Sequence, residues 1–346
     1  AMHHFLSDTA RHGNLNMSDA DETTFLDATR LKIGRLLNAQ PDNIAVVSSA
    51  SEILSQLPFL IKPKKNKKIV LVETDFPAIT RPWIAYSERK SLKLIFVKEQ
   101  IAENLTDQII KNLDETTAVV CVSFVQFSSG TRLNILKLRN ATKRLGIRLV
   151  VDITQAAGVI PISLESWEAD LVICSGYKWL GGHGGVAFAI FSADLLNFQP
   201  PWIGWFGGEN PFELDATRLL LAKTAAKYTQ STMSYISVIG LNAAIDNLLN
   251  IGIEKIYRHS NSLATILASR LEGLDWKSLH KFDNLEFSPH IISLNSSKVD
   301  IKKKFAELSK NGIICGIRNG RLRISIAHYN NQIDIETLIK QLQHFS

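Results

Sequence analysis

The 346-residue sequence predicts an α/β fold: a mostly parallel, seven-stranded-type sheet sandwiched by helices, followed by a smaller C-terminal α/β domain. Three observations predict it. The chain up to about residue 245 contains short, wholly apolar runs that end in small or polar residues, which is typical of strands buried on both faces. Helical patterns separate several of these runs, as parallel crossovers require. Beyond residue 245 a long amphipathic helix leads into a hairpin pattern.

Apolar residues at helical spacing predict a first helix over 21–38. A second helix is predicted over 51–61, with Pro58 as a kink or an end, and a third over 134–146. The predicted strands of the large sheet are IAVVS (44–48), KIVLVE (68–73), KLIFV (93–97), TAVVCVSFV (117–125), IRLVVD (147–152), ADLVICS (169–175) and VAFAIF (186–191).

The C-terminal part predicts a helix over 252–274, a strand at 290–295 and a helix over 300–311. Two more strands, in GIICGIR and GRLRISI, flank a turn at Asn319-Gly320, a pair that favours a hairpin. A last helix is expected over 334–345. We therefore expect an N-terminal segment, 1–30, that packs on the small domain, a large domain over 31–245 and a small domain over 246–346.

Composition excludes several classes of protein. Hydrophobic residues make up 45% and charged residues 21%, which is ordinary for a globular enzyme. No apolar run approaches 18 residues and the first residues lack a signal-peptide layout, so no membrane partner is expected. The basic run IKPKKNKK (61–68) contains no aromatic residue for base stacking, which favours a solvated loop over a nucleic-acid site. Cys121, Cys174 and Cys315 share no metal spacing and cannot all pair, so we expect no metal and a reducing cytoplasm.

The segment 149–185 carries the clearest chemical signal. Asp152 closes one apolar run, and Lys178 closes another and is followed by four glycines within seven residues. Singly, Asp152 reads as a helix cap or ion-pair partner, and Lys178 as a surface lysine. Together they suit pyridoxal 5'-phosphate (PLP), which needs a lysine for a Schiff base and an acid opposite its ring nitrogen. Glycines let the backbone pass close to a flat cofactor.

A site for the cofactor's phosphate is predicted in SSASEIL (48–54), where small hydroxyl residues end a strand directly before a helix. Ser49 and Glu52 have the spacing of a capping box, so the segment also reads simply as a capped helix. The same helix N-terminus offers free N–H groups and a positive dipole to a phosphate.

With these motifs in place, the chain resembles the class V aminotransferase family of fold-type I PLP enzymes, over about residues 30 to 346. The family includes cysteine desulfurases, selenocysteine lyases, isopenicillin N epimerase-like proteins and kynureninases. The segments that carry the resemblance are VDITQAAG (151–158), ADLVICSGYKWLGG (169–182) and GRLRISIAHYNNQIDIETL (320–338).

The resemblance implies a role for each matching residue. Lys178 forms the Schiff base and moves the proton at the substrate α-carbon, Asp152 pairs with the ring nitrogen, and Gln155 reaches the phenolic oxygen. The phosphate contacts implied are Ser51, the amide of Ala50, Ser175 and Tyr177.

Further roles follow from segments that match less of the family pattern. Phe76 matches the aromatic residue that stacks on the cofactor in kynureninase-like members, although it also reads as a core aromatic. Trp205 matches a tryptophan near the phosphate. Thr232 matches a threonine that reaches the phosphate of the other subunit, although Ser231 replaces the usual glycine, and the match implies a homodimer with shared sites. Arg323 matches the arginine that binds the substrate α-carboxylate, in a fork geometry suited to that group.

The reaction stays open at this level. The ending RNGRLRISIAHYNN is most similar to the epimerase-like and selenocysteine-lyase-like branch, which implies transamination or lyase/epimerase-like chemistry on an amino acid. Alternatives are a cysteine desulfurase, whose nucleophile could only be the strand-like Cys315, and a kynureninase-type Cβ–X lyase. From other classes, a nicotinamide dehydrogenase would take GGHGG as a nucleotide loop, but these glycines precede a strand and not a helix. A non-catalytic accessory protein with the same fold is the last alternative.

Overall fold

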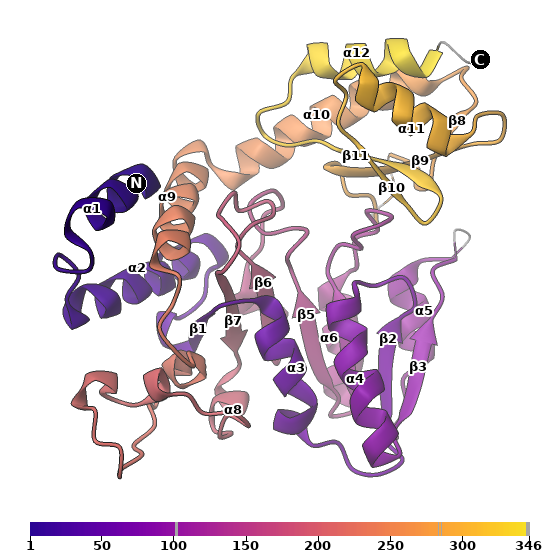
Figure 1. The fold of residues 1–346 in the computed structure, drawn as a ribbon. Coiled ribbons are helices and arrows are strands. Elements are labelled where there is room, and N and C mark those ends of the chain that lie inside the picture. The colour runs from indigo at the N-terminus through magenta and orange to yellow at the C-terminus, as the bar shows by residue number, and fades with distance from the viewer. Residues whose placement is uncertain (101–102, 283, 285, 344–346) are drawn as a thin grey trace.

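The computed structural model describes residues 1–343 except 101, 102, 283 and 285. Its centre is a seven-stranded sheet in the order β1-β7-β6-β5-β4-β2-β3 (Figure 1). Only β7 runs against its neighbours, so β1 to β6 share one direction. The strands are β1 (Ile44–Val47), β2 (Lys68–Val72), β3 (Lys93–Val97), β4 (Thr117–Ser123), β5 (Arg148–Asp152), β6 (Leu171–Ser175) and β7 (Ala187–Phe191). The expected α/β architecture is thereby confirmed.

Both faces of this sheet are buried because alternate strand residues enter two different hydrophobic clusters. In β5, Leu149 and Val151 pack into one cluster, while Val150 packs into the other. This explains why the strands are apolar throughout and do not alternate with polar residues. The helices of the region are α3 (Ala50–Ile61), α4 (Pro77–Lys90), α5 (Leu105–Lys111), α6 (Ile135–Arg144), α7 (Leu164–Trp167) and α8 (Ala193–Leu196). Helix α3 passes through Pro58 without ending there.

The N-terminal segment differs from the expectation. It forms two helices, α1 (Met2–His12), which sequence patterning missed, and α2 (Asp19–Leu37). Both pack on α9 (Tyr235–Ile251) (Figure 1). The Met2 sulfur lies 2.7 Å from where a Cβ of Gly240 would be. Residues 1–30 were expected to pack on the small domain; in the structure α1 and α2 contact α9, where the absence of a side chain at Gly240 leaves space for Met2.

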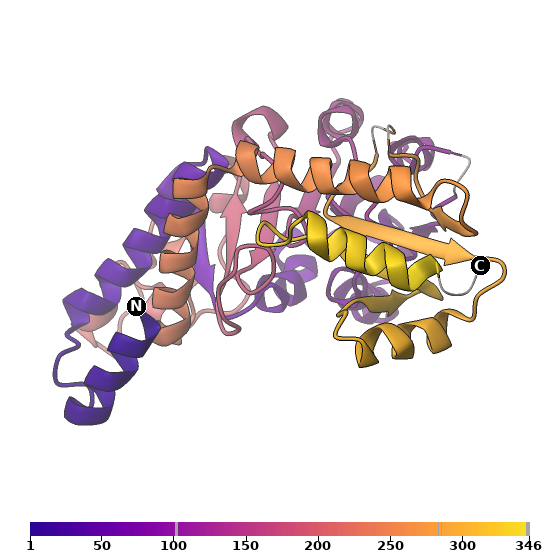
Figure 2. The ribbon, with the colours of Figure 1, turned by 90° about the horizontal axis from the view of Figure 1, so that it is seen from above.

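The small domain has its own core. Its antiparallel sheet has the order β10-β11-β9-β8, and Figure 2 shows α10 and α12 lying across it. The elements are α10 (Ile253–Leu271), β8 (Trp276–Ser278), β9 (Ile291–Ser296), α11 (Ile301–Lys310), β10 (Gly316–Arg318), β11 (Arg321–Ser325) and α12 (Gln332–Gln343). Asn319 and Gly320 both have positive φ, as the hairpin pattern predicted.

The residues that connect the two hydrophobic cores lie within α9 and α10, whereas the sequence placed the boundary at residue 246. Leu248 of α9 and Ile256 of α10 still belong to a large-domain cluster, while Leu263 belongs to the small-domain core. The last two residues of the helix expected over 334–345 lie outside the described residues. Within the described ranges, no single helix is both long and apolar enough to cross a membrane; α9 and α10 pass that test only as a pair, bent by 75°.

Candidate active site

The candidate site lies at one edge of the large sheet. Because β1, β2, β4, β5 and β6 are parallel, the residues that follow them all emerge at the same edge, where ligands gather in such sheets. Asp152 ends β5, and Lys178 follows β6, the neighbouring strand. The fold therefore brings together the acid and the amine that the sequence places 26 residues apart.

Asp152 is a buried carboxylate with one partner. Its Oδ1 accepts a hydrogen bond from the Thr154 amide at 2.6 Å, and the Thr154 side chain also stabilises the carboxylate. Burial raises the pKa of Asp152 to about 6, with bonds to Thr154 opposing the rise and the charge of Asp75 adding to it. Both interactions come from a neutral residue, so the carboxylate remains suited to a cationic partner.

Asp75, which the sequence analysis did not single out, is a second buried carboxylate at the same edge. Ser123 donates to it from its amide (2.8 Å) and its hydroxyl (2.6 Å), and Gln126 and the Phe76 amide donate as well. Burial raises the pKa of Asp75 even against these four donors. Its position three residues after β2, at the sheet edge where Asp152 ends β5, is the only local indication of its role in the sequence.

Lys178 has an exposed side chain in the glycine-rich segment after β6. Its Nζ lies 4.9 Å from the centre of the Tyr177 ring. Partial burial lowers the pKa of Lys178, and the positive charges of Arg323 and Arg318 lower it further. A Cβ at Gly176 would lie 2.9 Å from the main-chain oxygen of Val186, so this turn needs a glycine before the lysine.

Gln155 is held by residues from both domains. Its side-chain Oε1 accepts from the Trp179 indole N–H at 3.0 Å, and its main-chain oxygen accepts from His290 Nε2 at 2.6 Å. Within the described residues its amide nitrogen has no bonded acceptor, so it is available to donate. His290, which the sequence analysis also missed, is fully buried, and burial lowers its pKa to about 4.

The segment expected to bind the phosphate forms the start of α3. The Ser49 hydroxyl accepts from the Glu52 amide, as the cap predicted, but the Glu52 carboxylate accepts from the Ser48 amide and hydroxyl and not from Ser49. Ala50 is buried and Ser51 is exposed at the first turn. The N-terminus of α3 lies at the same sheet edge as Lys178.

The remaining expected cofactor contacts lie at the ends of two strands, β6 and β2. Ser175 is half-buried, and its amide donates to the Thr154 hydroxyl at 3.0 Å, which ties the end of β6 to the turn after β5. Tyr177 is exposed beside Lys178. Phe76 is 46% exposed and packs edge-on against Phe127, with ring centres 5.5 Å apart. A ring that remains half exposed has a face free for stacking.

Arg323 reaches the site from the small domain. Its Nη1 donates to the main-chain oxygen of Phe127 at 2.7 Å, while its buried Nε has no hydrogen-bond partner among the described residues. Burial lowers the pKa of Arg323, as does the charge of Arg318. An unpartnered buried guanidinium N–H points to an absent acceptor.

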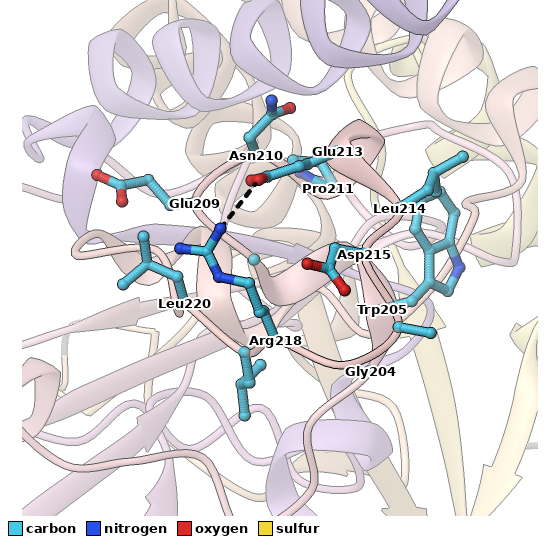
Figure 3. A pocket seen from close by; sticks show the side chains of 13 residues that line it. Gly204, Trp205, Glu209, Asn210, Pro211, Glu213, Leu214, Asp215, Arg218 and Leu220 are labelled. Atoms are coloured by element: carbon cyan, nitrogen blue, oxygen red, sulfur yellow. Dashed lines mark ion pairs between the residues drawn. The ribbon is translucent and has the colours of Figure 1, made fainter.

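Trp205 and Thr232 are placed elsewhere. Trp205 is 45% exposed and lines a cavity formed wholly by residues 204–220 (Figure 3), with Arg218 paired to Glu213 across it at 3.6 Å. Thr232 is exposed on the segment that passes Gly204 and Gly185. Within one chain, the structure does not bring Trp205 into a described cavity with Lys178.

The residues at the sheet edge fit PLP. The donor set comprises an exposed amine, a buried carboxylate that forms no ion pair among the described residues, a helix N-terminus with small hydroxyl residues and a half-exposed aromatic ring. The two glycines at 176 and 182 lie where added Cβ atoms would meet backbone oxygens at 2.9 Å. Each part of the cofactor that these groups would contact has a chemically suitable partner.

Comparisons with known proteins agree with this geometry. The aminotransferase class-V family profile matches residues 1–338. The uncharacterized aminotransferase YcbU of Bacillus subtilis (strain 168) is 26% identical, over 97% of this chain and 87% of the relative. The apo structure of a cysteine desulfurase from Thermococcus onnurineus NA1 matches with a TM-score of 0.84 at 22% identity, over 94% of this chain and 84% of that chain. A C-DES mutant with glycine covalently linked to its PLP cofactor matches with a TM-score of 0.89 at 18% identity, over 100% and 91%. The chain belongs to the aminotransferase class-V family of PLP-dependent enzymes.

Proposed function

We propose that this protein is a PLP-dependent enzyme that acts at the α-carbon of an amino acid, with Lys178 as the residue that carries the cofactor. The observation that carries the proposal is the placement of the Lys178 amine and the buried Asp152 carboxylate at the ends of adjacent parallel strands. When bound, PLP supplies an electron sink that stabilises negative charge at the α-carbon of the substrate.

Asp152 would hold the protonated ring nitrogen. An isolated buried carboxylate resists ionisation, as its raised pKa indicates, and a cation beside it favours the ionised form. Gln155 would donate its free amide N–H to the phenolic oxygen. Because Trp179 and His290 bond its two oxygens, this donor is already oriented.

Lys178 would also move the α-proton. Its lowered pKa increases the fraction of neutral amine at physiological pH, and a neutral amine is the form that accepts a proton or attacks a carbonyl. The cause is partial burial together with the two nearby guanidinium groups.

The phosphate would be bound at the N-terminus of α3 by Ser51 and the Ala50 amide, with Ser175 and Tyr177 contributing from the neighbouring strand. The exposed face of Phe76 would stack on the ring. Arg323 would bind the substrate α-carboxylate, which would satisfy its unpartnered Nε.

Among the reactions of the family, we favour transamination or selenocysteine lyase/epimerase-like chemistry over a persulfide-forming desulfurase. A desulfurase needs a reactive thiolate. Cys121 and Cys174 are buried in strands, and partial burial raises the pKa of Cys315 to about 11, so its thiol is protonated at neutral pH. A kynureninase-type reaction remains the alternative among Cβ–X cleavages.

We further propose a homodimer in the cytoplasm, with Trp205 and Thr232 contributing to the partner's phosphate site. Support comes from apolar side chains exposed on one segment, because a patch of this kind usually marks an interface. These are Trp202, Ile203, Trp205, Leu214, Leu219 and Leu220. Three free cysteines suit a reducing compartment.

Borohydride reduction tests the central proposal. Purified protein with added PLP is reduced, digested and mapped, and the modified peptide is expected to contain Lys178. Lys178→Ala should remove the label, whereas Lys90→Ala, at the exposed end of α4, should retain it. A label on another lysine in the wild-type protein would overturn the assignment.

A further inference from the structure

One face of the small-domain sheet carries three arginines. In the β10–β11 hairpin, Arg318 pairs with Arg321 and Gly316 pairs with Arg323, and paired residues of an antiparallel ladder share a face. Leu322 and Ile324 alternate with the arginines and are buried in the small-domain core. The arginine face is therefore opposite to that core, and Arg323 on it bonds to the large domain through Phe127.

The three arginines do not have the same surroundings. Arg321 lines a cavity that also contains acidic residues, among them Glu73 and Glu99. Arg318 and Arg323 instead line a second cavity of about 690 Å³, which they share with Ser325 and Tyr329. The only carboxylate in that lining, Asp334, already accepts from the Asn330 side chain and the Asn331 amide, each at 3.0 Å.

Arg318 lies close to the site, yet it has no function in the reaction proposed above. Its Nη1 donates to the main-chain oxygen of Ile317 at 2.7 Å and lies 3.7 Å from where a Cβ of Gly316 would be. The guanidinium therefore folds back along β10 toward Gly316, which is the residue that pairs with Arg323. Its positive charge lowers the pKa of both Arg323 and Lys178. In the described part of the chain, no acidic side chain forms an ion pair with Arg318 or Arg323.

In this arrangement Arg318 has no anionic partner among the described residues. In the proposed reaction the α-carboxylate of the substrate would neutralise Arg323. Arg318 would then remain beside a substrate with no opposite charge. A cation next to a binding site favours a ligand that carries a matching anion and disfavours one that does not.

We propose that the substrate is an amino acid whose side chain ends in a second anionic group, a carboxylate or sulfinate, and that Arg318 binds this group. The proposal rests on the proposed function, because Arg323 is taken to hold the α-carboxylate. Arg318 is thus a specificity-determining residue. Its fork of N–H donors suits an anion that presents two oxygens, and Arg318 already lines the cavity that it shares with Arg323.

Equilibrium titration of the PLP-loaded protein tests this inference. The absorbance of the bound cofactor is followed as L-aspartate, L-glutamate or L-cysteine sulfinate is added, and then with L-asparagine and L-glutamine, which match the first two in size but lack the charge. At least one acidic ligand is expected to bind about 10- to 100-fold more tightly than its amide, the range of a charge-assisted pair.

The variants locate the effect. Arg318→Ala should bring the ratio of acid affinity to amide affinity close to one without changing cofactor content. Arg318→Lys should restore part of the preference for the acid. Arg270→Ala, which removes the same charge from the exposed last turn of α10, should keep the wild-type ratio. Thermal unfolding shows whether each variant is folded. If Arg318→Ala does not fold, Arg318→Gln replaces it in the same titrations.

The outcomes separate this inference from the function it rests on. Equal binding of acids and amides by the loaded wild-type protein, or an unchanged ratio in Arg318→Ala, would overturn the role of Arg318 and leave the Lys178 chemistry in place. Failure of Lys178 to take a borohydride label would remove the proposed function, and this inference with it.

Discussion

His290 joins the small domain to the turn after β5, because its Nε2 donates to the main-chain oxygen of Gln155 at 2.6 Å. A carbonyl oxygen can only accept, so Nε2 carries the proton and the neutral ring accepts at Nδ1 from the Ser288 hydroxyl, 2.9 Å away. The Trp179 ring meets the imidazole edge-on, with ring centres 4.6 Å apart. His290 therefore positions both the main chain of Gln155 and the Trp179 ring that bonds the Gln155 side chain.

His290→Phe should lower the free energy of unfolding at pH 7.5 by about 1–3 kcal/mol, because it keeps a ring against Trp179 but leaves the buried Gln155 oxygen without a donor. It should also change the pH dependence. The pKa of His290 is about 4 in the fold against 6.5 when unfolded, so its stabilising effect is complete above pH 6.5 and is lost as pH falls toward 4. Urea unfolding at pH 5 and 7.5 measures both effects. Exposed His12→Phe is the control, and an equal pH slope in His290→Phe and wild type would contradict the prediction.

Asp152→Asn should make the cofactor-free protein more stable at pH 8. The pKa of Asp152 is raised from 3.8 to about 6 in the fold, so ionisation destabilises the native state as pH rises through this range, and the loss persists above it. Removing the charge should recover at most about 3 kcal/mol. The same variant should lose activity, because the ring nitrogen loses its acid. Denaturation of both proteins at pH 4 and 8 gives the result, and a variant less stable than wild type at pH 8 would refute it.

Arg323→Ala should raise KM for an amino acid substrate by about 100-fold while leaving cofactor content unchanged, because it removes a charged pair to the α-carboxylate. Arg323→Lys should recover only part of the loss, since an ammonium cannot supply the paired N–H groups. Steady-state kinetics and the absorbance of bound cofactor provide the two measurements. Loss of cofactor in either variant would show instead that Arg323 mainly maintains the structure.

Gly158→Ala should destabilise the protein and disturb the Lys178 segment. Gly158 has φ +97°, and a Cβ there would lie 2.6 Å from the main-chain oxygen of Trp179, the residue after the lysine. Gly146→Ala is a matched control, because φ is +65° but no atom lies within 4 Å of the added Cβ. We expect a loss of about 1 kcal/mol for Gly146→Ala from strain alone and a larger one for Gly158→Ala. Equal thermal shifts would show that the contact with Trp179 relaxes freely.

Leu219→Glu should shift the protein from dimer toward monomer. Leu219 is 61% exposed on the apolar segment that also contains Trp205, and burying a carboxylate in an interface is unfavourable. Leu136→Glu, on the exposed face of α6 at 49% exposure, should leave the elution volume unchanged. Light scattering after gel filtration gives the mass. A wild-type protein that is an active monomer would contradict the shared-site proposal.

Sequence patterns located the strands of the large sheet because most of them are apolar throughout, and they located several of the longer helices. They did not assign α4, α9 or β8, nor α1, which contains no buried residue and rests on α9 through contacts such as Met2 with Gly240. A helix without a buried stripe has no periodic signal for sequence reasoning to detect. The helix on which α1 packs, α9, lies more than 220 residues further along the chain.

Within the site, the amine and the acid were accessible from the sequence because each follows an apolar strand. Asp75 follows β2 in the same way, but its importance arises from Ser123 and Gln126, which come from another strand and loop. Nothing local marks His290 either, since its partner, Gln155, is 135 residues away.

The sequence alone determined which strands of the large sheet form, and that an amine and an acid lie at strand ends. Burial periodicity and the residue types at the ends of strands are local properties of the chain. Tertiary structure alone decided that Arg318 and Arg323 share a cavity, that burial, with a smaller contribution from Asp75, raises the pKa of Asp152, and that His290 bonds Gln155. These relationships depend on distances between distant segments, and electrostatic and hydrogen-bond energies change steeply with distance.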